Sequence, residues 1–105
     1  GHLSMKPSDY FKRNIGVGAS CAKRDDLQAS RFLGQDKLMW GSDYPHPEGT
    51  WPMTGVRLKE NFSGVPEDEI RKLLGENALS WYGMSRDALQ PIADRIGPTY
   101  SDLQA

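Results

Sequence analysis

In this 105-residue sequence, the residues best suited to catalysis or metal binding are in the segment Ser42-Asp43-Tyr44-Pro45-His46-Pro47. An aspartate carboxylate can bind a metal ion or act as a general base. Each proline biases the residue before it toward extended geometry, so Tyr44 and His46 are expected on a stiff segment. The pattern makes Asp43 a candidate metal ligand or general base. The alternatives are a turn or capping role for Asp43, and packing or hydrogen bonding for His46.

Two strands and a helix are predicted to position Asp43. Residues Asn14–Cys21 alternate between apolar and small side chains, and Lys37–Ser42 is a short apolar run without alternation. A helix from Asp26 to Leu33 is expected between them, with Gly34 as its stop. Because the joints are short, this order indicates a βαβ unit with parallel strands. Asp43 would then follow the carboxyl end of the second strand, where parallel α/β folds build their active sites.

The rest of the chain is predicted to be mainly helical, with a long loop over Asp43–Pro52. A turn or single helical turn capped by Ser8 is expected at Pro7–Phe11, and a helix over Met53–Phe62. A further helix over Ile70–Tyr82 should begin near Pro66 and be kinked or split at Gly75. Ser85 should cap a last helix that Pro91 interrupts, and an extended tail should follow from Pro98. Two parallel strands do not make a finished sheet, because both edges stay open. The simplest account is the end of a larger α/β domain.

Composition excludes several classes of protein. Val, Ile and Thr together number only ten, too few for an all-β sandwich or barrel. The formal net charge of −1 without a basic block argues against nucleic-acid binding, and no apolar run is long enough to span a membrane. The single cysteine, Cys21, cannot form an internal disulfide, which fits a reducing, cytoplasmic location.

Four segments together resemble one enzyme family. Trp40-Gly41-Ser42-Asp43-Tyr44-Pro45-His46 resembles the stretch at the eighth strand of amidohydrolase-2 enzymes, a family that includes aminocarboxymuconate-semialdehyde-decarboxylase-like proteins. The other resembling segments are Lys6–Phe11 before the seventh strand, Leu74–Ala78 with Trp81–Gly83 in the C-terminal helix, and Ile96–Thr99 in the tail of one subgroup. The resemblance covers most of the chain.

The resemblance implies a (β/α)₈ TIM barrel, a fold that typically needs about 250 residues. This chain would be a helix-rich α/β C-terminal fragment of it, with two parallel strands and four to five helices. Asp43 would be the strand-eight aspartate that binds a divalent metal, with zinc expected, and that can take a proton from the metal's water. The family's H-x-H pair has no counterpart here, so we expect this chain alone to bind no metal tightly and to be inactive.

Five other side chains have candidate roles. Tyr44 and His46 could line the substrate pocket, with loop packing as the alternative. Trp51 could cover the barrel mouth, or instead anchor the next helix at the surface. Cys21 is expected to be a small buried hydrophobic residue, because no histidine neighbours it in sequence. Asn77 is expected to satisfy backbone groups near the break at Gly75.

The predicted organisation is a cloning scar or linker at residues 1–5, the barrel portion at 6–103 and a tail at 104–105. The intact enzyme would be a metal-dependent hydrolase or decarboxylase acting on a small carboxylate or amide. The open sheet predicts a homo-oligomer. The alternative function is a non-catalytic module that associates with itself.

Overall fold

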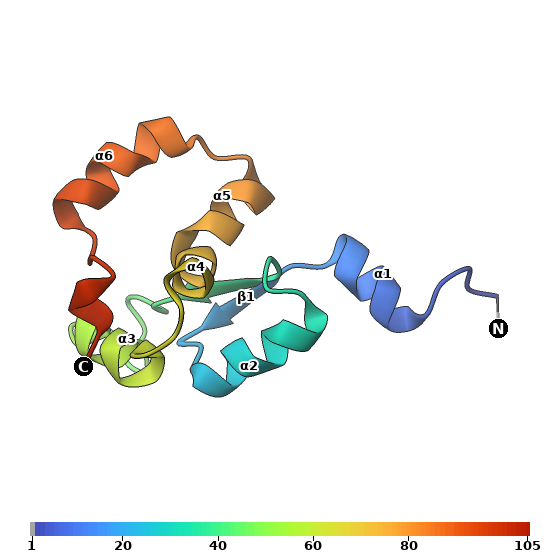
Figure 1. Ribbon diagram of the computed structural model, residues 1–105, viewed down its shortest axis with the longest axis horizontal. Coiled ribbons are helices and arrows are strands. Elements are labelled where there is room, and N and C mark those ends of the chain that lie inside the picture. The colour runs from blue at the N-terminus through green and yellow to red at the C-terminus, as the bar shows by residue number, and fades with distance from the viewer. Residues whose placement is uncertain (1) are drawn as a thin grey trace.

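The computed structural model describes residues 2–105 (Figure 1). Gly1, the first residue of the expected scar or linker at 1–5, lies outside the described residues. In chain order the elements are α1 (Pro7–Asn14), β1 (Val17–Ser20), α2 (Arg24–Leu33), β2 (Leu38–Gly41), α3 (Thr54–Phe62), α4 (Glu67–Arg71), the π-helical turn η1 (Lys72–Glu76), α5 (Asn77–Tyr82), α6 (Arg86–Ile96) and the 3₁₀ turn η2 (Ser101–Leu103).

The βαβ unit is confirmed. Strands β1 and β2 pair in parallel, with Val17 opposite Leu38 and Ser20 opposite Gly41. Helix α2 joins them and ends at Gly34, whose φ of 119° is a conformation that side chains disfavour. Both strands are shorter than expected: Asn14 belongs to α1, and the chain turns at Cys21 directly after β1.

The segment from Glu67 to Tyr82 is one continuous helical body. Its α4 and α5 parts are joined by the π-helical turn η1, in which the backbone amide of Asn77 donates to the oxygen of Lys72. Gly75 lies inside this turn, so the sequence signal marks a widened turn and not a split. With α4, η1 and α5 counted together, residues 2–105 hold two parallel strands and five helical bodies, as the predicted helix-rich α/β class requires.

The hydrophobic core lies between β2 and the helices that follow the loop. Its buried members are Leu27, Leu38, Leu58, Phe62, Val65, Ile70, Leu73 and Leu103. Val17 and Ala19 of β1 pack against this cluster, whereas Gly18 and Ser20 on the opposite face are exposed. One face of the sheet is therefore covered by helices, and on the other face β1 is exposed, as its small residues predict.

The C-terminal segment differs from the expected extended tail. Leu103 in η2 is buried in the core, and the Tyr100 hydroxyl donates to the backbone oxygen of Val65 at 2.9 Å. The Asp102 carboxylate accepts from the backbone amide of Thr99 at 2.7 Å and from its hydroxyl at 2.8 Å. This is the Thr-x-x-Asp spacing of a helix start, and an apolar residue follows it, so the chain turns back into the core.

Two local predictions about helices were wrong. Helix α1 begins at Pro7, so Ser8 lies within its first turn and makes no capping hydrogen bond. Helix α6 is capped by Ser85 as expected but continues through Pro91 to Ile96. An interior proline removes one amide donor and crowds the preceding turn, yet α6 spans it, and Gln90 Nε2 donates to Asp94 Oδ1 at 2.7 Å across the proline.

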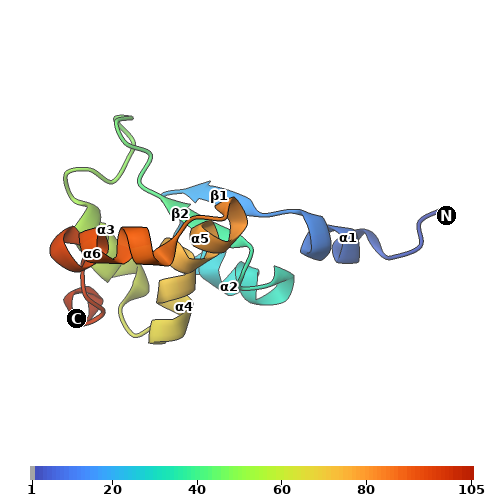
Figure 2. The same cartoon turned by 90° about the horizontal axis from the view of Figure 1, so that it is seen from above.

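The molecule is elongated, with principal extents of 50 × 30 × 28 Å. Helix α1 buries no residue and extends away from the sheet, while α6 arches over the far side of the helical body (Figures 1 and 2). Among residues 2–105, no helix has both the length and the apolar character needed to cross a bilayer.

Candidate functional site

Asp43 lies two residues beyond β2, at the carboxyl end of the parallel pair. Its φ of 59° is in the left-handed region, which is uncommon for residues other than glycine but tolerated by aspartate. Cys21, one residue beyond β1, has a similar φ of 55°. Each strand is thus followed, within two residues, by a residue in the left-handed conformation. Such conformations persist only where the surrounding structure holds them.

Cys21 contacts the loop that carries Asp43. Its backbone amide donates to the oxygen of Gly41 at 2.7 Å, and its Sγ lies 3.7 Å from the oxygen of Ser42. The residue is partly exposed and sits past the strand. The expectation of a buried side chain on the strand's apolar face was therefore wrong, because the chain turns at Cys21 and directs it toward the loop.

Backbone hydrogen bonds close the loop after β2 onto itself. The amide of His46 donates to the oxygen of Asp43 at 2.8 Å, and the amide of Thr50 donates to the oxygen of Ser42 at 2.9 Å. Gly49 lies against this backbone, since a Cβ there would approach the oxygens of Ser42 and Asp43 to 2.8 and 2.9 Å. The loop is therefore a compact unit that projects from the helical body (Figure 2).

This closure brings three possible metal ligands together. One ligand atom each from Asp43, His46 and Glu48 lie within 4.8 Å of one another. The Nδ1 atom of His46 is 3.4 Å from Oε1 of Glu48. Two carboxylates and an imidazole are a donor set that suits zinc and similar divalent ions. The donor chemistry therefore fits the divalent metal that the family resemblance implies.

Glu48 was missed by the sequence analysis. The spacing Asp43-x-x-His46-x-Glu48 contains the signal, but its meaning depends on a loop that folds back on itself. In an extended segment, three such residues would diverge. The tight approach at Gly49 makes the convergence possible.

Tyr44 and Trp51 pack against each other on the exposed side of the loop. Their ring centroids are 5.6 Å apart at an interplanar angle of 78°, an edge-to-face contact. Both side chains are largely exposed. A role of Tyr44, His46 or Trp51 in a substrate pocket stays a prediction.

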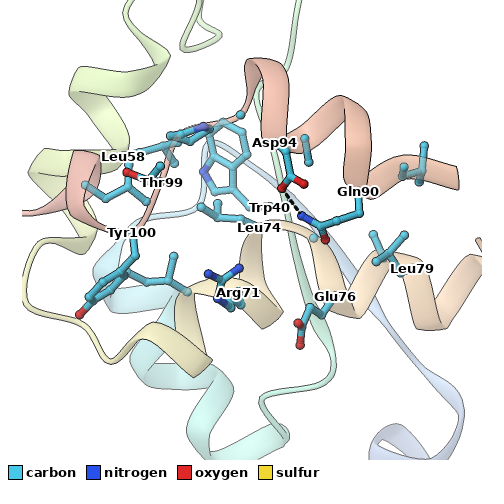
Figure 3. A pocket seen from close by; sticks show the side chains of 18 of the residues that line it. Trp40, Leu58, Arg71, Leu74, Glu76, Leu79, Gln90, Asp94, Thr99 and Tyr100 are labelled. Carbon is cyan, nitrogen blue, oxygen red and sulfur yellow. Dashed lines mark hydrogen bonds between the residues drawn. The ribbon is translucent and has the colours of Figure 1, made fainter. Parts of the chain in front are cut away.

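A separate cavity of about 970 Å³ lies between the helical body and α6 (Figure 3). Apolar side chains such as Leu74, Leu79 and Trp40 dominate its lining, with Arg71 and Glu76 at its polar side. No residue of the loop 42–51 lines it. We therefore place the candidate metal-binding site at the loop after β2 and not in this cavity.

Two residues outside the loop are structural. Trp40 is half-buried and packs against the core. Asn77 is buried, and its Nδ2 donates to the backbone oxygens of Gln35 at 2.6 Å and Leu38 at 2.8 Å. The structural role of Asn77 is confirmed, but its partners lie at the start of β2 and not at the Gly75 turn.

Comparison with known proteins identifies the family. A family model described as Amidohydrolase matches residues 28–84, more than half of the chain. The matched region runs from α2 through β2 and the loop to the end of α5. The chain belongs to this amidohydrolase family. No curated protein and no solved structure matches it significantly.

Proposed function

We propose that this chain is the C-terminal portion of a metal-dependent hydrolase or decarboxylase with a (β/α)₈ barrel, of the aminocarboxymuconate-semialdehyde-decarboxylase-like kind. In this proposal β1 and β2 are the seventh and eighth strands. The carrying observation is the place of Asp43, directly beyond the carboxyl end of β2 in a parallel pair. Barrel enzymes of this architecture build their active sites at that end.

Asp43 is the residue that would hold the divalent ion, for which zinc is the expected identity. Such an ion polarises a carbonyl group and lowers the pKa of water, so that a nucleophile is available near neutral pH. Asp43 would bind the ion through one carboxylate oxygen and accept the attacking water's proton at the other. Tyr44, His46 and Trp51 would face a small carboxylate or amide substrate from the same loop.

We expect this chain to be inactive without the remaining strands. The sheet formed by residues 2–105 has two strands, so its outer edges have no neighbouring strand. The bare face at Gly18 and Ser20 is the side that a barrel interior would occupy. The chain thus supplies one side of the proposed active site. A cytoplasmic location remains a prediction that rests on the lone thiol of Cys21.

The test uses the longer protein that includes both this chain and the sequence encoded directly upstream of it. Zinc content after dialysis and turnover of carboxylate and amide substrates are measured for the wild type, Asp43→Asn and the control Glu60→Gln. Glu60 is an exposed carboxylate of α3 paired with Arg57 at 3.0 Å. We expect loss of zinc and turnover only in Asp43→Asn. Full zinc content and activity in that variant would refute the assignment.

The second candidate is a non-catalytic, self-associating module. It is favoured by the apolar cavity under α6 and by large apolar side chains left exposed on α5, on α6 and between them: Trp81, Tyr82, Met84 and Ile96. Exposed apolar surface of this kind often marks contact sites. Light scattering at micromolar concentration tests whether this chain forms the predicted homo-oligomer. A monomer that unfolds cooperatively would argue against association.

A further inference from the structure

The loop after β2 carries more metal-binding capacity than a single aspartate provides. The expectation that this chain binds no metal tightly rests on Asp43 as the one available ligand. The structure adds an imidazole and a second carboxylate, all with ligand atoms within 4.8 Å of the others. Ligand atoms that share a divalent ion at about 2.0–2.2 Å can lie no more than about 4.4 Å apart, so only a small side-chain movement is needed to gather these three around an ion.

The three side chains differ in how strongly the fold holds them. Asp43 is half-buried at the strand end, while the side chains of His46 and Glu48 are 64% and 72% exposed. The exposed pair can therefore reorient toward an ion without disturbing the core. The backbone that carries them is fixed by the loop's own hydrogen bonds, which lowers the entropy cost of gathering the ligands.

We infer that Asp43, His46 and Glu48 together form a three-ligand site for a divalent transition-metal ion within this chain. The inference rests on the proposed role of Asp43 as a metal ligand and extends it to two residues of the same loop. A set of one nitrogen and two oxygens leaves a fourth position open, as catalytic zinc sites do. Because two ligands are exposed, the affinity of this chain alone is expected to be modest.

The experiment titrates the full 105-residue chain with Zn²⁺ by calorimetry and follows the histidine ring protons by NMR. The chain has two histidines, His2 and His46, so their signals can be told apart with single variants. We expect one ion per chain and a shift of the His46 signals alone. Substitutions Asp43→Asn, His46→Ala and Glu48→Gln should each weaken binding about tenfold or more.

Matched controls separate this site from adventitious binding. His2→Ala removes the other imidazole, and Glu60→Gln removes an exposed carboxylate elsewhere. These two variants should bind Zn²⁺ as the wild type does. Circular dichroism spectra of all variants should coincide, because the substituted loop ligands lie outside the core.

The outcomes distinguish this inference from the proposed function. Absence of binding by the wild-type chain, or binding that survives both His46→Ala and Glu48→Gln, would overturn the three-ligand site. Suppose that the three-ligand site is overturned, but that in the longer protein Asp43→Asn loses zinc while His46→Ala and Glu48→Gln keep it. The proposed role of Asp43 would then stand. If zinc in the longer protein were indifferent to Asp43→Asn, the proposed function would fail as well.

Discussion

The side-chain amide nitrogen of Asn77 lies 2.8 Å from the backbone oxygen of Leu38, the first residue of β2. The same nitrogen lies 2.6 Å from the oxygen of Gln35. One buried amide thus ties the first turn of α5 to the entry of the strand that ends next to Asp43. The π-helical turn before Asn77 carries its side chain to this position.

We predict that Asn77→Ala lowers the free energy of unfolding by about 1–3 kcal/mol, because two backbone oxygens at the strand entry lose their side-chain donor. Urea denaturation followed by tryptophan fluorescence measures the change. The control is Asn61→Ala, which removes a similar amide whose hydrogen bond to the backbone oxygen of Arg57 in α3 is exposed. Equal stability of the two variants would show that the Asn77 contacts contribute little.

Gly49→Ala is predicted to distort the loop after β2. The new Cβ would approach backbone oxygens of Ser42 and Asp43 closer than 3 Å, and backbone cannot move aside as a flexible side chain can. Zinc binding should weaken, with a loss of stability of about 1–3 kcal/mol. Gly55→Ala in α3 is the control, because no atom lies within 4 Å of its added Cβ. Unchanged zinc affinity in Gly49→Ala would contradict the fixed-loop account.

Leu103→Ala is predicted to destabilise the protein by about 2–5 kcal/mol, the range for truncating a buried leucine. The C-terminal turn then loses its anchor in the core. Thermal unfolding of this variant is compared with that of Leu89→Ala, whose side chain in α6 is exposed. A small, equal effect for both would mean that the C-terminal turn does not belong to the core.

Local patterns were sufficient to predict the central unit from the sequence. Alternation in 14–21, the acidic start of α2 and the stop at Gly34 are short-range signals, and they specified the parallel pair correctly. The same holds for Asp43, whose place after the strand follows from the end of an apolar run. Its chemical role rests on family resemblance and is not given by the pattern alone.

The remaining features depend on contacts between residues distant in sequence. Leu103 is buried against core residues of α3 and α4. The two backbone oxygens that accept from Asn77 Nδ2 lie about forty residues earlier in the chain. The convergence of Glu48 on Asp43 depends on loop closure around Gly49. None of these is specified by periodicity, although the Thr99–Asp102 spacing offers a local hint of a turn.

The Asp102 carboxyl is predicted to make the C-terminal turn sensitive to acid. Hydrogen bonds from the backbone amide and the hydroxyl of Thr99 hold the pKa of Asp102 below its ordinary value. The stabilisation is therefore complete above the unfolded pKa of about 3.9 and is lost as pH falls through the lower folded pKa. The Thr99 amide proton shift should titrate below pH 3.9 in NMR spectra. A midpoint at or above that pH would contradict this prediction, and Asp102→Asn should abolish the titration.

The most direct test of the account is the location of zinc in crystals of this chain grown with the ion. Anomalous diffraction at the zinc absorption edge should show a peak about 2.0–2.2 Å from a carboxylate oxygen of Asp43, with His46 and Glu48 as its other protein ligands. Asp43→Asn crystals should lack that peak. Zinc found only at other positions, or a peak at the loop that does not contact Asp43, would contradict the account.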